Sequence, residues 1–185
     1  MLTPFLLGIA LLVSTPIMTV PATAQEALTP NDITCALDPS CPKSQRQLLH
    51  RKDRRGVITE GVSAEQPLSV NLYVNFAYNS AELTSDARIT LDGLGTALRD
   101  PRLATFSFVI AGHTDAKGGA EFNQKLSERR AAAVRSYLIT QFDIAAERLT
   151  AKGYGKTQLL DPANPEDGVN RRVQVINATA ASPRN

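Results

Sequence analysis

The chain has 185 residues, enough for one ordinary domain with extensions. Twenty Lys and Arg residues stand against 18 Asp and Glu residues, and the resulting net charge of +2 gives no support for nucleic-acid binding by the whole chain. Hydrophobic residues make up 43% of the sequence and Trp is absent, so we expect a compact core built from aliphatic side chains.

Residues 1–24 have the pattern of a secretory signal peptide. No charged residue occurs between Leu2 and Val20, and the run "ATA" that ends at Ala24 offers the small residues that a signal peptidase needs. An uncleaved membrane anchor is the alternative, but Pro16 interrupts an apolar run that is already shorter than the ~20 residues of a spanning helix. We therefore expect cleavage after Ala24 and no transmembrane span in the mature chain.

Residues 25–66 are expected to form a polar lead-in, which contains both cysteines of the chain, Cys35 and Cys41. The turn-forming residues "DPS" between them favour close approach, and export would place them where disulfides persist. We expect a disulfide whose small loop adds about 2–3 kcal/mol of stability. Two free thiols are the alternative, whereas two cysteines without a matching pair do not complete a zinc site.

A basic run, "KSQRQLLHRKDRRG", follows the cysteines within the lead-in. Its charge could attract an anionic surface, such as phosphorylated lipid headgroups or an acidic polymer. The run has no interleaved aromatic residues, however, and a solvated linker explains it more simply. We therefore expect a linker.

Residues 67–178 are expected to form the domain itself, followed by a frayed tail at 179–185. Apolar residues alternate in "PLSVNLYVNF", which is typical of a strand with one buried face. A helix capped by Thr84 should follow. Its apolar stripe comprises Ala87, Leu91, Leu94 and Leu98.

The rest of the domain continues this alternation. "ATFSFVIAG" predicts a buried central strand, and a long helix is expected from Glu121 to about Gln141. The residues expected to face inward from that helix are Phe122, Leu126, Val134, Tyr137 and Leu138. Two further strands are expected in "ERLTAKGYG" and "RRVQVIN", separated by the proline-rich loop "LLDPANPEDGVN". The order β-α-β-α-β-loop-β predicts an α/β (α+β) fold, a two-layer sandwich in which helices cover a mixed four-stranded sheet.

The segment "GHTDAKGGAEFNQKLSERR" carries an acid and an arginine at informative positions. Asp115 lies at the carboxyl end of the central strand, where ligands tend to bind in such sheets. Helical spacing places four residues on one face: Asn123, Leu126, Ser127 and Arg130. Because helical side chains lean toward the amino end, Arg130 should point back at Asp115. The acid can bind an ammonium group and the arginine a carboxylate, which suits a zwitterion, but the two could equally pair with each other.

The run "FAYNSAEL…GHTDAKGGAEFNQKLSERRAAAVRSYL…RLTAKGYG…DGVNRRVQV" resembles the OmpA-like domain, and the resemblance covers about residues 67–178. It implies non-covalent binding of peptidoglycan through the free zwitterionic end of diaminopimelate in the stem peptide. By match to the motif "GHTD…N..LS.RRA", the acid that binds diaminopimelate falls on Asp115 and the arginine on Arg130.

The resemblance also assigns further residues to this site: Thr114, Asn123, Leu126, Asn170 and Arg171. Arg171 could add a second cation near the carboxylates of the peptide, or it could form a salt bridge at the start of the last strand. Some relatives carry acids after the first strand, where this chain has "AYNS". Asn79 can still form hydrogen bonds there, but it supplies no charge.

Catalysis and nucleotide binding find little support. His113 and Asp115 share a face at the strand end, but the other histidine, His50, lies in the lead-in and no G-x-S-x-G motif occurs. "GYGKT" resembles the end of a phosphate loop, yet Thr150 stands where that motif requires its first glycine. We expect no catalytic residue, no metal and no cofactor, and we expect His113 to be a structural hydrogen-bonding residue.

These features together predict an exported, non-catalytic protein of a Gram-negative bacterium that binds peptidoglycan and tethers or organises the cell wall and outer membrane. Its expected location is the periplasm or the cell outer membrane. The alternative is an envelope scaffold that docks on another periplasmic or outer-membrane protein, without nucleic acid as a partner.

Overall fold

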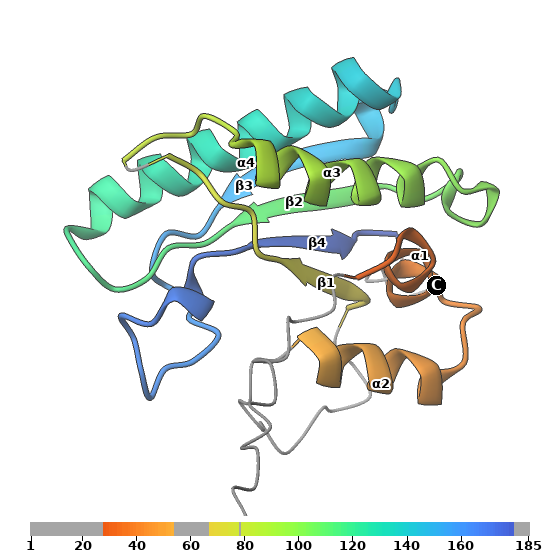
Figure 1. Ribbon diagram of the computed structural model, residues 1–185, viewed down its shortest axis with the longest axis horizontal. Helices are drawn as coiled ribbons and strands as arrows, with labels where there is room; N and C mark the ends of the chain where they lie inside the picture. The colour runs from red at the N-terminus through yellow and green to blue at the C-terminus, as the bar shows by residue number, and fades with distance from the viewer. Residues whose placement is uncertain (1–27, 54–66, 78, 180–185) are drawn as a thin grey trace, which may run out of the picture.

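Figure 1 shows the computed structural model, which describes residues 28–53, 67–77 and 79–179. The predicted signal peptide at 1–24 lies outside the described residues, as do most of the predicted tail and part of the lead-in. In the part of the chain that is described, no helix is both long enough and apolar enough to cross a bilayer.

The elements alternate between strand and helix after two amino-terminal helices. In chain order they are α1 (Pro30–Leu37), α2 (Lys43–Asp53), β1 (Ser69–Leu72), α3 (Ser85–Leu98), β2 (Phe108–Gly112), α4 (Ala120–Phe142), β3 (Leu149–Gly153) and β4 (Val173–Asn177). Short 3-10 helices lie at η1 (Pro101–Leu103), η2 (Ala146–Arg148) and η3 (Gly168–Asn170). From β1 onward the order matches the alternation predicted from the sequence.

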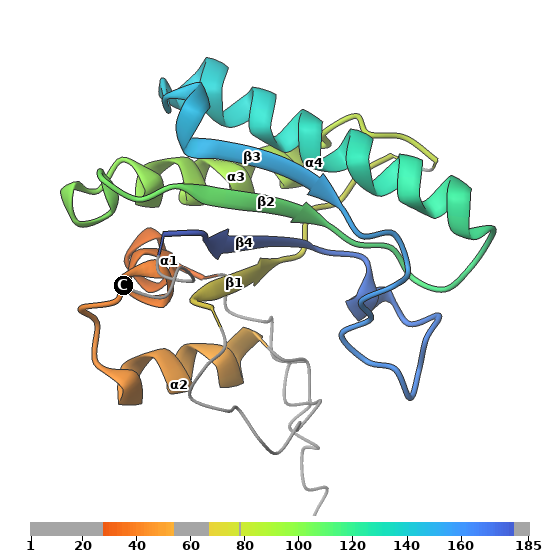
Figure 2. The same cartoon turned by 180° about the vertical axis from the view of Figure 1, so that it is seen from behind.

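The four strands form one mixed sheet in the order β1-β4-β2-β3 (Figure 2). β2 and β3 are parallel neighbours joined by α4, whereas β4 lies between β1 and β2 and is antiparallel to both. In this register Val175 lies opposite Val70 on one side and Ile110 on the other, and all three side chains are buried. The predicted mixed four-stranded sheet is therefore confirmed.

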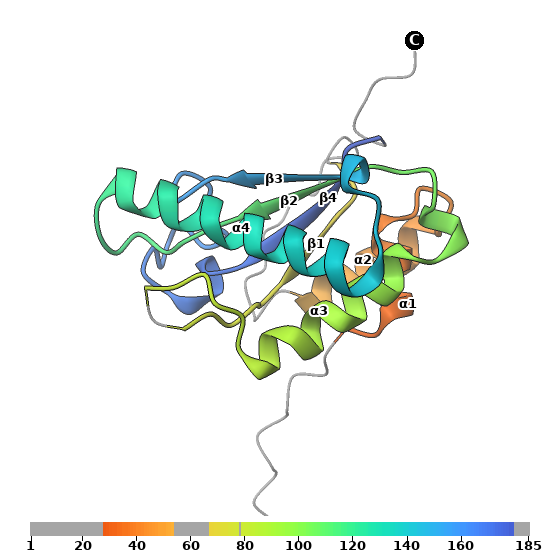
Figure 3. The ribbon, with the colours of Figure 1, turned by 90° about the horizontal axis from the view of Figure 1, so that it is seen from above.

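Helices α3 and α4 lie together over one face of the sheet (Figure 3), which gives the predicted two layers. The stripe predicted for α3 is fully buried and comprises Ala87, Leu91, Leu94 and Leu98. Thr84 caps this helix as expected, because its hydroxyl accepts a hydrogen bond of 3.2 Å from the backbone nitrogen of Ala87. The core is aliphatic, with Phe108 as its largest fully buried side chain.

The face that α4 buries differs in part from the prediction. Leu126, Val134 and Leu138 are buried, but Phe122 is 48% exposed and Tyr137 is only partly buried. The buried stripe begins instead at Asn123, one residue and about 100° around the helix from Phe122. Asn123 is thus the inward residue at the start of α4, and its amide donates a hydrogen bond to the Lys117 carbonyl in the loop before the helix.

Helix α1 belongs to the core, although the sequence analysis placed it in a polar lead-in. Thr29 caps it through a reciprocal pair of hydrogen bonds with Asp32, and Ile33 and Leu37 are completely or almost completely buried. The side-chain amide of Asn177 at the end of β4 donates to the Leu37 carbonyl over 2.8 Å, in a buried position. The folded unit therefore begins before residue 67.

The predicted disulfide between Cys35 and Cys41 is present and links α1 to the loop that follows it. One nitrogen of the Arg46 guanidinium on α2 donates to the backbone carbonyls of Asp38 and Cys41 in this loop. The first part of the predicted linker is thus an ordered helix that holds the disulfide loop in place.

His113, directly after β2, is buried and 1% exposed. Its ring stacks on Tyr154 with centroids 5.4 Å apart, and neither ring nitrogen has a hydrogen-bond partner among the described residues. Packing therefore holds this side chain. The Gln174 side chain and the Gln158 backbone lie near the ring without forming a full hydrogen bond, so the predicted hydrogen-bonding role is not confirmed. Burial, assisted by the nearby charge of Arg172, lowers the pKa of His113 from 6.5 to about 3, so the ring is neutral near pH 7.

We predict that Leu37→Ala lowers the free energy of unfolding by about 2–5 kcal/mol, because it leaves a cavity in the core. Leu48→Ala on α2 is the matched control, since Leu48 is 59% exposed and its truncation should change stability by less than about 0.5 kcal/mol. Urea denaturation of both variants measures the difference. Equal effects would show that α1 is not part of the cooperative core.

We also predict that His113 makes the protein sensitive to acid. The unfolded chain binds a proton at this ring near pH 6.5, whereas the folded chain does so only near pH 3. The free energy of unfolding should therefore fall by about 1.4 kcal/mol for each pH unit between these values, in addition to the effect of other groups. His113→Gln should flatten this slope in denaturation curves recorded from pH 7 to pH 4; an unchanged slope would contradict the assignment.

Candidate functional site

The candidate site lies at the carboxyl ends of β2 and β3, where two loops meet the start of α4 (Figure 2). Close packing of α4 on the strands fixes this region. A Cβ atom at Gly112 would collide with the backbone carbonyl of Ser127, and one at Gly153 would collide with the Ser127 side chain. The Ser127 hydroxyl also accepts a 2.9 Å hydrogen bond from the backbone nitrogen of Gly155. These glycines allow α4 to lie directly against the strand ends.

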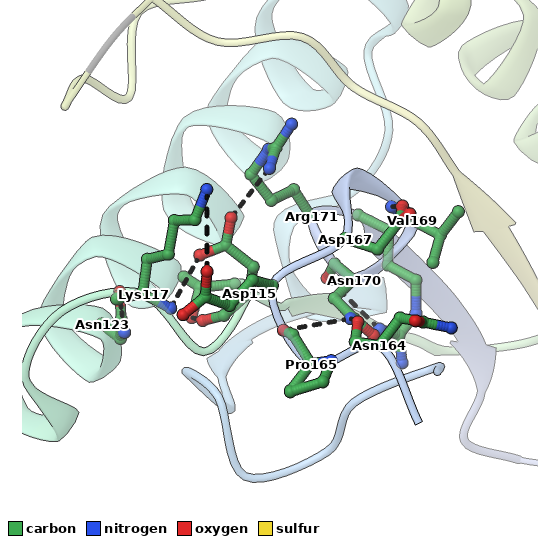
Figure 4. A network of polar contacts seen from close by, with 12 residues as sticks. Asp115, Lys117, Asn123, Asn164, Pro165, Asp167, Val169, Asn170 and Arg171 are labelled. Carbon is green, nitrogen blue, oxygen red and sulfur yellow. Dashed lines mark hydrogen bonds and ion pairs between the residues drawn. The ribbon is translucent and has the colours of Figure 1, made fainter. Parts of the chain in front are cut away.

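Asp115 lies within this region and is largely enclosed, with 11% of its side chain exposed. One carboxylate oxygen accepts a hydrogen bond of 3.2 Å from the backbone nitrogen of Lys117. The other forms an ion pair of 2.8 Å with the guanidinium of Arg171, which reaches across from the loop after β3 (Figure 4). The carboxylate is therefore held from two sides.

Arg130 comes from α4 and is half-buried. Its Nε donates a hydrogen bond of 3.0 Å to the Ser80 carbonyl, and its guanidinium carbon lies 4.8 Å from the centre of the Phe76 ring. Within the described part of the chain, neither Nη nitrogen makes a hydrogen bond. The guanidinium is thus held in place through Nε, and its two Nη nitrogens are the donors that remain for a ligand.

The charges of the three residues act on one another. Burial lowers the pKa of Arg130, the positive charge of Arg171 lowers it further, and the carboxylate of Asp115 raises it. Two guanidinium groups therefore share the neighbourhood of a single carboxylate. The sequence left open whether Asp115 and Arg130 pair with each other; the ion pair that forms joins Asp115 to Arg171 instead.

Four other predicted site residues are buried and make internal contacts. Thr114 and Leu126 are 2% and 6% exposed, and the Thr114 hydroxyl donates to the Asp115 carbonyl. The Asn123 amide donates to the Lys117 carbonyl over 2.7 Å, which ties the loop to α4. The Asn170 amide accepts from the backbone nitrogen of Asp161 and donates to carbonyls of its own loop. Asn123 and Asn170 thus shape the two loops that hold Asp115 and Arg171.

Asn79 lies on the loop that Arg130 holds through Ser80. It is exposed and adopts a left-handed backbone conformation with φ of 52°, a conformation that asparagine tolerates better than most residues. No hydrogen bond joins its side chain to Asp115, Arg130 or Arg171. Its position follows from the turn between Phe76 and Leu83, which form an isolated antiparallel bridge.

Lys156 helps to hold the candidate site together, a role that the sequence did not predict. Its ammonium group donates to the Gly118 carbonyl over 2.9 Å, and the backbone nitrogen of Ala116 donates to the Pro165 carbonyl over the same distance. These contacts join the loop after β2 to the loop after β3. No motif or spacing marks them, because they connect residues about 40 and about 50 positions apart in the chain.

Asp115, Arg130 and Arg171 are the charged side chains on which the candidate site rests. His113 is buried and neutral, and its ring is stacked on Tyr154. Among the described residues no group of three or more His, Cys, Asp and Glu side chains could hold a metal ion. What the site offers is one carboxylate and two guanidinium groups at fixed positions.

Known proteins share this domain. The family model for OmpA matches residues 75–172, just over half of the chain. Outer membrane porin F of Pseudomonas aeruginosa is 30% identical over 146 residues, which cover 78% of this chain and 39% of the porin. Photosystem I P700 chlorophyll a apoprotein A2 of Gloeobacter violaceus is 32% identical over 162 residues, which cover 81% of this chain but 18% of that protein.

The solved OmpA-like domain of FopA1 from Francisella tularensis superposes with a TM-score of 0.50 at 28% identity, over 62% of this chain and 75% of that one. The chain spans less than half the length of the two curated relatives, and their names refer to different processes. The similarity therefore concerns the shared domain and not the activity of those whole proteins. From the family match, the sheet order and the solved domain together, we conclude that the chain belongs to the OmpA family.

Proposed function

We propose that this protein binds peptidoglycan non-covalently through the free end of diaminopimelate in the stem peptide. That end carries an ammonium group and a carboxylate on one carbon atom. In this proposal Asp115 binds the ammonium group and Arg130 binds the carboxylate. OmpA-like domains are known to bind peptidoglycan in envelope proteins, which supports the ligand class.

The observation that carries the proposal is the arrangement of Arg130. Because its Nε is occupied by the Ser80 carbonyl, its two Nη nitrogens are the donors left for a ligand. Two parallel N–H groups match the two oxygens of a carboxylate, and contact with the Phe76 ring fixes their direction. A phosphate would also meet Asp115 nearby, whereas a zwitterion places its positive charge there.

The proposal extends to the setting of the protein. Members of the family act as structural or binding proteins and not as enzymes, and the relative from P. aeruginosa is an outer membrane porin. We propose that residues 1–24 direct export and that the protein works in the periplasm or at the outer membrane. Binding there would tether or organise the cell wall.

We predict that Asp115→Asn and Arg130→Gln each weaken binding of meso-diaminopimelate by about 1–3 kcal/mol, because the opposing charge of the ligand is left unpaired. Calorimetric titration measures the loss, and co-sedimentation with purified sacculi tests it on the polymer. Amidated sacculi, which lack the carboxylate assigned to Arg130, should sediment less of the wild-type protein than unamidated sacculi.

Arg129→Gln is the matched control. Arg129 is the exposed neighbour of Arg130 on α4 and its loss changes the net charge by the same amount. Thermal melting of each variant checks that Arg130→Gln, which also loses the bond to Ser80, is still folded. Equal affinity of wild type, Asp115→Asn and Arg130→Gln for diaminopimelate would refute the proposed function.

A further inference from the structure

Asp115 already has a cation bound to it. The Nη1 atom of Arg171 lies 2.8 Å from one carboxylate oxygen, and the Arg171 side chain is 52% exposed while that of Asp115 is 11% exposed. The guanidinium therefore occupies one oxygen of a carboxylate that has little exposed surface. A ligand ammonium group that binds this oxygen has to displace Arg171.

The fold fixes where Arg171 lies. Its backbone nitrogen donates to the Gly168 carbonyl over 3.0 Å at the end of η3, and the buried amide of Asn170 holds the loop just before it. A Cβ atom at Gly168 would lie 2.9 Å from the Nη2 of Arg171. The absence of a side chain at Gly168 thus leaves room for the guanidinium in its position against Asp115.

The charges favour a ligand with both signs. In the unliganded protein Arg171 neutralises Asp115, and Arg130 has no anionic partner among the described residues. An ammonium group alone can enter only by displacing Arg171, which would then add an unpaired positive charge beside Arg130. A ligand that brings a carboxylate with its ammonium group places one anion between Arg130 and the displaced guanidinium, so that both arginines have a partner.

We propose that Arg171 is a specificity-determining residue, because it occupies Asp115 until a ligand supplies an ammonium group together with a carboxylate. This inference rests on the proposed function, since it assumes that Asp115 binds the ammonium group. The inference adds to that function the class of stem peptide that the site rejects. Peptidoglycan whose stem peptide carries lysine, with an ammonium group and no carboxylate at the free end, leaves the displaced Arg171 unpaired.

Two synthetic stem peptides test the proposal: L-Ala–γ-D-Glu–meso-diaminopimelate and L-Ala–γ-D-Glu–L-Lys, which lacks the carboxylate at the free end. Calorimetric titration gives the ratio of their dissociation constants for each variant. Wild type should prefer the diaminopimelate peptide. Arg171→Gln should bind the lysine peptide about two- to fivefold more tightly than wild type, because the ammonium group no longer has to displace a partly exposed ion pair, and its ratio should shrink.

Gly168→Ala provides a second variant that keeps every charge. It should displace the tip of Arg171 and shift the ratio in the same direction, though less far. Arg129→Gln, which loses an arginine outside the ion pair, should keep the wild-type ratio. An Arg171→Gln protein that binds the lysine peptide no better than wild type would overturn the inference, even if its affinity for the diaminopimelate peptide fell.

The outcomes also separate this inference from the proposed function. A wild-type protein that binds neither peptide overturns both. A wild-type protein that prefers diaminopimelate, with the same ratio in Arg171→Gln, overturns the role of Arg171 and leaves Asp115 and Arg130 in their proposed roles.

Discussion

The contact between α4 and the ends of β2 and β3 is the constraint on which the site depends. Gly112 leaves room for the backbone carbonyl of Ser127 and Gly153 leaves room for its hydroxyl, because a Cβ atom at either glycine would collide with them. Arg130 lies about one helical turn beyond Ser127, so this contact sets its distance from the loop that carries Asp115. A larger side chain at either glycine would push α4 away from the strand ends. Arg130, which lies on α4, would then move relative to Asp115.

Two buried side-chain amides also hold the loops of the site in place. Asn123 binds the loop after β2, and Asn170 binds the loop after β3, each through a buried side chain. Buried polar groups that have all their partners hold a loop more rigidly than exposed ones. The charged residues can therefore be partly exposed and still be precisely placed. The ion pair between Asp115 and Arg171 is only partly exposed, but half of the Arg171 side chain reaches solvent, so a ligand can displace it.

Much of the domain could be predicted from local patterns. The alternation of apolar residues around Val70 and Val175 predicted the strands, and the spacing from Asp115 to Arg130 predicted two candidate site residues, because both signals lie within one or two elements. Helix α1 escaped prediction because its eight residues are too few to show a period. Arg171 and Asp115 are 56 residues apart in the chain, so no local pattern predicts that Asp115 pairs with Arg171 and not with Arg130. Phe122 was misplaced because Asn123, a polar residue, takes the buried position.

The attachment of α1 has a mechanical consequence. A force applied to the chain ahead of this helix acts first on the packing of Leu37 and on the hydrogen bond between the Leu37 carbonyl and Asn177. The hydrogen bonds of the sheet bear the force only later. The strand reached through Asn177 is β4, which is flanked by β1 and β2, so it cannot be peeled away like an edge strand. If α1 unfolds, the disulfide limits how much the chain can lengthen, because the residues between Cys35 and Cys41 cannot extend. The first helix and its crosslink would therefore absorb strain from a pull on the amino-terminal side, while the candidate site at the ends of β2 and β3 keeps its shape.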